Sequence, residues 1–316
     1  MKRALAVLLL LAGGVLALVW LWPVRQGPTE RLPVVASFYP LYEFARRVGG
    51  ERVEVTTLVP PGVEPHDWEP SPRDVARLYQ ARLFVYNGAG LEPWVEKLLG
   101  GAPPSLVAVN VTEKIPLRAV DLPRHHGHHE EKARGPAPAG RESDPHVWLD
   151  PVLAQSQVEA IRAALSRTDP AHAPAYDANA RSLVAALAML HRQYEQGLAD
   201  CARREFVTSH AAFGYLATRY RLTMIPIMGV APEAEPSPAE LARIARTVRR
   251  HGIRYVFFET LVSPKLAETL AREVGARTLV LNPVEGVTAE EAAAGKDYLT
   301  LMRENLANLR TGLECR

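Results

Sequence analysis

Short apolar segments of strand type alternate with helical segments along most of this chain, and the alternation occurs in two separate series. Strands that alternate with helices of about ten residues are typical of βαβ units, which place parallel strands in one sheet. The predicted strands are 32–38, 53–59, 83–87 and 106–110 in the first series, and 205–209, 223–228, 254–258 and 277–281 in the second.

One long helical pattern separates the two series. Between Pro174 and Leu198 the large apolar residues recur at spacings of three, four and seven, which keeps them on one face of a helix. At ~1.5 Å per residue such a helix is roughly 35 Å long, enough to run along two lobes. We therefore predict an α/β fold with an N-terminal lobe over 32–172, a linking helix over 173–199 and a C-terminal lobe over 200–316.

The first 23 residues predict export. Lys2 and Arg3 precede an apolar run from Ala4 to Trp22, as in a signal peptide or a membrane anchor. The run is long enough to span a bilayer, and no small-residue cleavage motif follows Leu21, so cleavage and anchoring both stay open. In either case we expect the rest of the chain to work in the periplasm or at the cell surface.

The cysteine count and the net charge argue against two kinds of binding site, a thiolate metal site and a nucleic-acid site. Cys201 and Cys315 are the only cysteines, and an isolated pair in an exported chain predicts a disulfide rather than a thiolate metal site. The formal net charge is +2, and no basic stripe interleaved with aromatic residues is present, so we expect no nucleic-acid partner. We expect a monomer.

Three histidines lie where ligands of an α/β fold are usually found. His66 follows the strand at 53–59, and His210 follows the strand at 205–209. His146 lies in a Pro-His pair like that of His66. Because the carboxyl ends of parallel strands form ligand sites, we expect these imidazoles to converge. Three neutral imidazoles favour a borderline-soft divalent metal, with Zn²⁺ before others.

Each histidine also has a simpler interpretation. His66 and His146 would then be loop histidines, and His210 would be the N-cap residue of a helix. A positive helix end also lowers the pKa of a histidine, which favours the neutral form that binds metal. Glu259 also follows a predicted strand, and it would be a metal ligand, a residue that orients an imidazole or a structural carboxylate; we favour the last two.

A second histidine group lies in a segment without apolar periodicity. Residues 123–142 are rich in proline, glycine and charge, and they are predicted to form a mobile surface loop. The loop is either a solvated insert or a weak, labile zinc-collecting site. Its histidines are His125, His126, His128 and His129.

Several motifs together resemble the metal-binding (cluster A-I) solute-binding proteins of ABC transporters, and within them the zinc-uptake type. The resemblance covers Val34 to Cys315 and implies two lobes joined by a rigid long helix, with the metal in a cleft between them. It also implies a Zn²⁺ carrier that serves a membrane permease, and not an enzyme. The motifs are Pro65-His66-Asp67-Trp68-Glu69-Pro70-Ser71, Asp144-Pro145-His146-Val147-Trp148-Leu149-Asp150-Pro151, Thr208-Ser209-His210-Ala211-Ala212-Phe213-Gly214-Tyr215, Glu235-Pro236-Ser237-Pro238, Phe258-Glu259 with Val262-Ser263-Pro264-Lys265, and Asp297-Tyr298 through Met302 to Asn305.

The resemblance places the first three ligand positions of the family on His66, His146 and His210. In this respect the chain resembles the zinc branch of the family, which has a histidine at the third position, because manganese binders tend to carry a carboxylate there. The chain departs from the family at the fourth position, where Asn282 replaces the usual aspartate before proline. The fourth ligand is therefore water, Glu64, Glu285 or an oxygen of Asn282; we expect water, since zinc accepts three protein ligands and a water.

Two other functions stay open at this point. The same scaffold could carry manganese or iron, although three histidines favour zinc. Three histidines and a water also form a catalytic zinc site. However, the sequence contains no His-Glu-x-x-His pair and no Gly-x-Ser-x-Gly motif, and Glu259 is the only candidate base.

Overall fold

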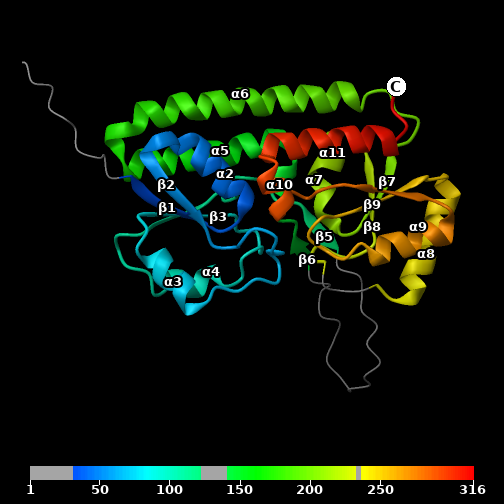
Figure 1. Ribbon diagram of the computed structural model, residues 1–316, viewed down its shortest axis with the longest axis horizontal. Coiled ribbons are helices and arrows are strands. Elements are labelled where there is room, and N and C mark those ends of the chain that lie inside the picture. Colours follow the sequence, from blue (N-terminus) through cyan, green and yellow to red (C-terminus); the bar gives the residue numbers. More distant parts are fainter. Residues whose placement is uncertain (1–30, 122–140, 233–235) are drawn as a thin grey trace, which may run out of the picture. The chain divides into compact units, whose positions relative to one another are not determined.

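Two four-stranded sheets, each entirely parallel, form the framework of the protein (Figure 1). The computed structural model describes residues 31–121, 141–232 and 236–316. The first sheet has the order β2-β1-β3-β4, with β1 Leu32–Ala36, β2 Val53–Thr57, β3 Leu83–Tyr86 and β4 Val107–Asn110. The second has the order β10-β9-β7-β8, with β7 Glu205–Thr208, β8 Thr223–Pro226, β9 Tyr255–Phe258 and β10 Arg277–Val280. All eight predicted strands are present.

Helices connect the strands, as the alternating pattern predicted. The helices next to the first sheet are α2 (Tyr39–Gly49), α3 (Pro72–Tyr79), α4 (Val95–Leu99) and α5 (Pro151–Thr168). Those of the second half are α7 (Gly214–Arg219), α8 (Pro238–His251), α9 (Lys265–Val274), α10 (Ala289–Ala293) and α11 (Tyr298–Gly312). Short 3-10 turns are η1 (Gly50–Arg52), η2 (Val147–Leu149), η3 (Pro170–His172) and η4 (Ala211–Phe213). Ser71 and Ser237 begin α3 and α8 with reciprocal capping boxes.

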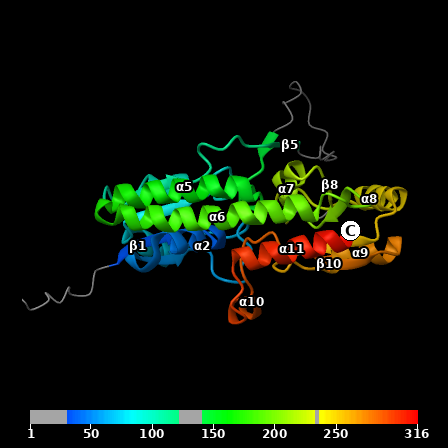
Figure 2. The same cartoon turned by 90° about the horizontal axis from the view of Figure 1, so that it is seen from above.

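The long helix α6 (Ala173–Gly197) confirms the predicted linking element. Its 25 residues extend over roughly 37 Å at ~1.5 Å per residue. The helix packs against α2 and α5 of the first half and against α11 of the second half (Figure 2). The predicted apolar face is buried, and its members include Tyr176, Leu183, Leu187, Leu190 and Tyr194.

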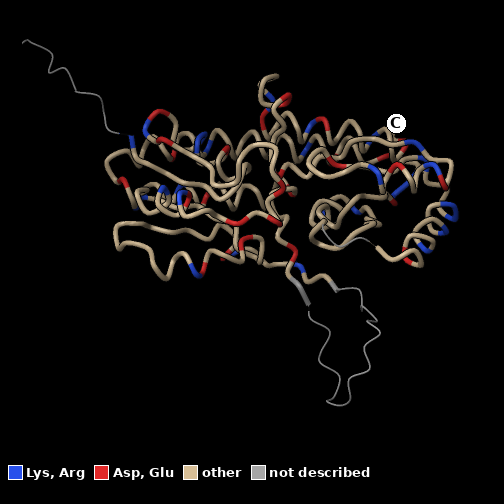
Figure 3. The backbone as a smooth tube through the Cα atoms, turned by 60° about the horizontal axis from the view of Figure 1, so that its bottom comes forward, with Lys and Arg blue, Asp and Glu red and all other residues tan. Residues whose placement is uncertain are grey.

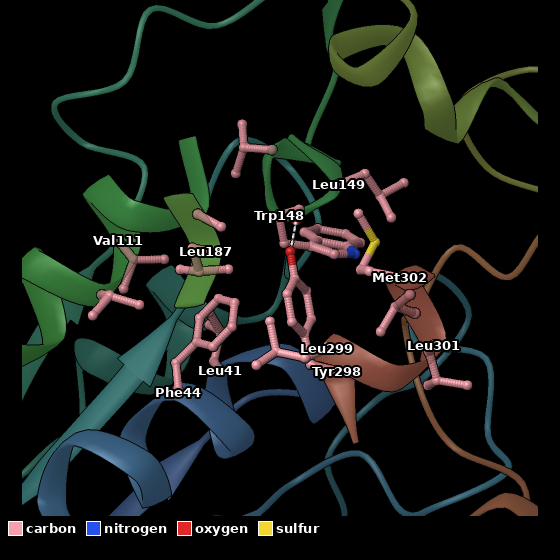
Figure 4. Packing of buried hydrophobic residues seen from close by; sticks show 14 of the residues in the cluster. Leu41, Phe44, Val111, Trp148, Leu149, Leu187, Tyr298, Leu299, Leu301 and Met302 are labelled. Carbon is pink, nitrogen blue, oxygen red and sulfur yellow. Dashed lines mark hydrogen bonds between the residues drawn. The ribbon is translucent and has the colours of Figure 1, made fainter. Parts of the chain in front are cut away.

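One buried apolar core continues from the first half into the second. Leu83 of the first sheet and Phe206 of the second belong to the same cluster. At the junction, the hydroxyl of Tyr298 donates to the carbonyl of Trp148 (Figure 4), and the rings of Tyr298 and Phe44 are 4.9 Å apart. A cluster of this kind resists separation of the two halves, because moving them apart would expose buried apolar surface.

The disulfide between Cys201 and Cys315 is present, as predicted. It joins the segment that follows α6 to the end of the chain after α11. Among the described residues, no helix combines the length and the apolar character needed to cross a membrane. The predicted export segment at 1–23 and the histidines at 125–129 lie outside the described residues. Residues Leu32–Arg316 form one compact unit, so the lobe boundaries that we placed at 172 and 200 stay predictions.

The structure also contains elements that the sequence analysis missed. Helix α5 begins at Asp150, whose side chain accepts the backbone N–H of Val152, and Pro151 follows as the first helical residue. The strands β5 (Ala119–Asp121) and β6 (Arg141–Ser143) pair in antiparallel register on either side of the histidine-rich segment. The predicted loop at 123–142 therefore overlaps the start of β6; its remainder, up to residue 140, lies outside the described residues.

Candidate metal centre

Four side chains from distant parts of the chain converge at one point. His66, His146, His210 and Glu285 each bring one possible ligand atom into a group whose atoms all lie within 4.8 Å of one another. His66 lies in the loop after β2, His210 two residues after β7, and Glu285 in the loop after β10. His146 immediately precedes η2. Three of the four residues thus follow the carboxyl ends of parallel strands, where ligands of open α/β sheets bind.

The distances within this group match a tetrahedral metal site. The Nε2 atom of His146 lies 3.2 Å from Nε2 of His66 and 3.2 Å from Nε2 of His210. The Oε1 atom of Glu285 lies 3.1 Å from Nε2 of His146 and 3.5 Å from Nε2 of both His66 and His210. Zinc ligands at about 2.0–2.1 Å define a tetrahedron with edges of about 3.3 Å. Five of the six distances among the four atoms, 3.1–3.5 Å, therefore lie close to the edge that one tetrahedral ion requires, and the whole group lies within 4.8 Å.

His146 is oriented by the buried carboxylate of Asp144. Its Oδ1 atom accepts the backbone N–H of His146 at 3.0 Å and lies 2.9 Å from the ring Nδ1. Because Nδ1 faces this carboxylate, the Nε2 atom carries the free lone pair and points to the other ligands.

His210 is held in the same way by Glu259. One carboxylate oxygen accepts the backbone N–H of His210 at 3.1 Å, and the other lies 2.7 Å from the ring Nδ1. Both residues are buried. Glu259 thus has the contacts expected of a residue that orients an imidazole, one of the two roles that the sequence favoured, and the carboxylate is turned away from the ligand group.

His66 has a looser environment than the other two histidines. Its side chain is 7% exposed, whereas those of His146 and His210 are fully buried. Glu64 accepts the backbone N–H of His66 at 3.2 Å. Among the described residues no carboxylate contacts Nδ1 of His66. Its ring is therefore oriented less firmly than the other two rings.

The carboxylates raise the proton affinity of the buried imidazoles. Burial alone would lower the pKa of His210, but the charges of Glu259 and Glu285 raise it well above the ordinary value. Burial also opposes protonation of His146, yet the hydrogen bonds that its ring donates to the carboxylates of Asp144 and Glu285 raise its pKa. The sequence-based expectation of a lowered pKa for His210 is therefore wrong, because the charges of Glu259 and Glu285 raise it.

The two glutamates near the imidazoles behave in opposite ways. Burial would raise the pKa of Glu285, but His210 and hydrogen bonds to the three imidazoles lower it well below the ordinary range. Burial and the charge of Glu285 raise the pKa of Glu64 to about 9. Glu285 is thus the anionic member of the site, and Glu64 favours its neutral form. Acidic residues also lie along the middle of the backbone trace (Figure 3), which favours a cation there.

Asn282 builds the loop that presents Glu285. The Oδ1 atom of Asn282 accepts the backbone N–H of Val284 at 2.7 Å, and its Nδ2 donates to Glu291. Val284 has a φ of 57°, in the left-handed region that non-glycine residues rarely adopt. This Asn-Pro turn directs Glu285 to the imidazoles, so its carboxylate lies beside the three histidines; the sequence had favoured water as the fourth ligand. The group therefore contains a fourth protein side chain although residue 282 is an asparagine.

The remaining histidines of the described residues do not join this group. His172 contacts Asp169, His191 contacts Tyr220 and Glu195, and His251 contacts Glu205. All three are partly or largely exposed. The sequence left open whether Glu285 is a metal ligand. The pair Asn282-Pro283, which begins three residues before Glu285, was the sequence signal for a tight turn at this place.

Comparisons with known proteins identify the family to which the chain belongs. A family model described as zinc-uptake complex component A, periplasmic, matches residues 34–312. The high-affinity zinc uptake system protein ZnuA of Bacillus subtilis is 40% identical, over 90% of this chain and 88% of that protein. The zinc-binding protein AdcA of Streptococcus pyogenes is 37% identical, but this chain spans only 61% of its length. The crystal structure of the Zn(II)-bound ZnuA-like domain of Streptococcus pneumoniae AdcA superposes with a TM-score of 0.75 at 37% identity, over 90% of this chain and 100% of that domain.

Proposed function

Since this chain belongs to the family of periplasmic zinc-uptake complex component A proteins, we propose that it captures Zn²⁺ outside the cytoplasmic membrane and delivers it to an ABC transporter permease. The ion is the cargo of the protein. We assign His66, His146, His210 and Glu285 as its four ligands. The observation that carries this proposal is the spacing of 3.1–3.5 Å for five of the six pairs among their Nε2 and Oε1 atoms.

The donor set supports zinc over the harder ions. Three imidazoles and one carboxylate in a tetrahedron suit Zn²⁺, whereas Mn²⁺ favours oxygen ligands and a higher coordination number. All four ligands come from one chain, which supports the proposal of a monomer that binds one ion.

The same donor set supports a carrier over a zinc hydrolase. A catalytic zinc keeps one position for water, but here four protein side chains would fill the four positions of a tetrahedral ion. The candidate base Glu259 faces the ring of His210 with one oxygen and the backbone of His210 with the other. A hydrolytic water would have neither a coordination position nor a free base beside it.

Metal binding tests the ligand assignment directly. We expect the chelator-stripped protein to bind one Zn²⁺ per chain far more tightly than micromolar, and to prefer Zn²⁺ to Mn²⁺. His210→Ala and Glu285→Gln should each weaken binding by at least about 100-fold. His191→Ala removes a partly exposed histidine of α6 and should leave the affinity unchanged. Binding no tighter than micromolar, or a preference for Mn²⁺, would contradict the proposal.

Delivery is tested in cells that lack this chain. We expect such cells to grow poorly when zinc is scarce, and to recover with the wild-type chain but not with His210→Ala. Recovery with both chains would show that delivery does not depend on the assigned site.

A further inference from the structure

Two carboxylates support the metal centre in the same way, but only one of them has a cationic neighbour. Asp144 supports His146 and Glu259 supports His210, in each case through the backbone N–H and the ring Nδ1. The guanidinium of Arg118 lies 3.5 Å from the other oxygen of Asp144. Among residues 31–121, 141–232 and 236–316, no lysine or arginine forms an ion pair with Glu259.

The backbone fixes the position of Arg118 independently of its charge. Its N–H donates to the hydroxyl of Tyr215 at 2.9 Å, and that hydroxyl donates to the carbonyl of Asp144 at 2.9 Å. The N–H of Asp144 in turn donates to the carbonyl of Arg118 at 2.9 Å. This closed ring of three hydrogen bonds joins the segment before β5, the segment after β6 and helix α7. It does not require the guanidinium.

The side chain of Arg118 then reaches Asp144 across a glycine. A Cβ atom at Gly214 would lie 2.6 Å from Oδ2 of Asp144 and would overlap the guanidinium. The guanidinium also lies 5.7 Å from the centre of the Tyr215 ring, within the range of a cation–π contact. The side chain of Arg118 is 38% exposed, whereas that of Asp144 is 1% exposed. One charged group at the surface therefore contacts a buried carboxylate that in turn contacts a proposed ligand.

From this asymmetry we infer that Arg118 limits the zinc affinity of the site through Asp144 and His146. The guanidinium attracts electron density of the Asp144 carboxylate away from the imidazole of His146. A weaker carboxylate partner makes the imidazole a weaker donor to the metal. Arg118 is thus a positioning residue whose charge keeps the cargo releasable. The inference rests on the proposed zinc-binding function.

Arg118→Gln in the full chain tests this inference. The substitution removes the charge but retains the backbone ring of hydrogen bonds. We expect it to tighten zinc binding by about three- to tenfold at low ionic strength, less than the effect of direct partners because Arg118 is partly exposed. The gain should shrink at about 1 M salt, where the charge of the wild-type arginine is screened. Arg118→Lys keeps the charge and should bind zinc as the wild type does.

A matched control separates this effect from the loss of an ion pair as such. Arg219 contacts the buried Asp150 at 2.8 Å, and Asp150 caps α5 without contacting an imidazole. Arg219→Gln should lower the melting temperature and leave zinc affinity unchanged. In an Asp144→Asn background, Arg118→Gln should alter the affinity by less than about twofold, because its effect passes through that carboxylate.

The outcomes distinguish the two proposals. A wild-type protein that binds zinc tightly, combined with unchanged or weaker binding by Arg118→Gln, would overturn only the role of Arg118. A full Arg118→Gln effect in the Asp144→Asn background would do the same. A wild-type protein that does not bind zinc would overturn the proposed function and this inference with it.

Discussion

The three imidazoles of the metal centre differ in how firmly each is held. His146 and His210 are buried against carboxylates, while no carboxylate contacts the Nδ1 atom of His66 among the described residues. A ligand on a loop, with little support behind it, can leave the ion at lower cost than a buried one. We therefore expect His66 to dissociate first when the cargo is released.

Zinc affinity should depend steeply on pH near neutrality. Zinc binds the neutral imidazole, and the pKa values of His146 and His210 are raised above the ordinary histidine value of about 6.5. Protons therefore compete with zinc at a higher pH than they would at ordinary histidines. We expect affinity to rise as pH increases from 6 to 8, with more than one proton released per zinc. Chelator competition at several pH values, together with calorimetry in two buffers, measures both quantities.

The metal-free protein should show the matching effect on stability. For His146 and His210 the folded pKa lies above the unfolded one, so their contribution stabilises the fold below the ordinary pKa and is lost as pH rises through the raised value. Glu64, with a pKa of about 9, destabilises the fold progressively as pH rises from about 4.5 to 9. We expect the melting temperature without metal to fall over this range. A melting temperature of the metal-free protein that stays constant over this range would contradict these pKa shifts. For the prediction on metal binding, a zinc affinity that is constant between pH 6 and 8 would contradict them.

At the scale of single elements, the loop between β10 and α10 presents Glu285, which we propose as the fourth ligand. Its backbone is held by Asn282, whose side chain accepts the N–H of Val284, and by Trp148, whose Nε1 donates to the carbonyl of Pro283 at 2.7 Å. Trp148 lies two residues after His146, so the two loops that present His146 and Glu285 contact each other directly.

Asn282→Ala should weaken zinc binding although Asn282 is not a ligand in our assignment. The substitution removes the acceptor for Val284, whose left-handed conformation costs roughly 1–2 kcal/mol and needs this support. Glu285 would then be held less firmly, and we expect a loss of affinity of about tenfold, measured by chelator competition. Asn282→Ala loses both side-chain hydrogen bonds of Asn282. Asn282→Asp keeps the oxygen that accepts from Val284 and loses only the hydrogen bond from Nδ2 to Glu291, so it is the matched control. Equal loss in both variants would assign the effect to Glu291 instead.

The elements found from the sequence are those with a local pattern. The strands and α6 were predictable because the spacing of apolar residues along the chain indicates which side chains are buried, as at Leu183, Leu187 and Leu190. The β5–β6 hairpin was missed because each of its strands contains three residues and little apolar pattern. The position of Glu285 depends on the φ of Val284 and on the distant Trp148. No local pattern encodes such a contact, so three ligand candidates could be chosen while the fourth stayed open.

On the scale of the whole molecule, the two halves share structure at three places. The apolar core passes through Trp148 and Tyr298, and α6 packs against helices of both halves. Arg47 of α2 also pairs with Asp297, the N-cap residue of α11, at 2.6 Å. A molecule connected in this way cannot unfold one half without exposing the buried surface of the other.

We therefore expect the metal-free protein to unfold in a single calorimetric transition, despite its two separate sheets. Zinc should move that transition to higher temperature, since a ligand present at a thousand times its Kd stabilises the folded state by about 4 kcal/mol. The disulfide needs a control, because it closes a loop of 114 residues and could couple the halves by itself, at about 4–5 kcal/mol in the chain-entropy treatment. A variant with both Cys201→Ser and Cys315→Ser should melt at a lower temperature but still in one transition. If its melting instead separates into two steps, the covalent link rather than the continuous core makes the two halves cooperative.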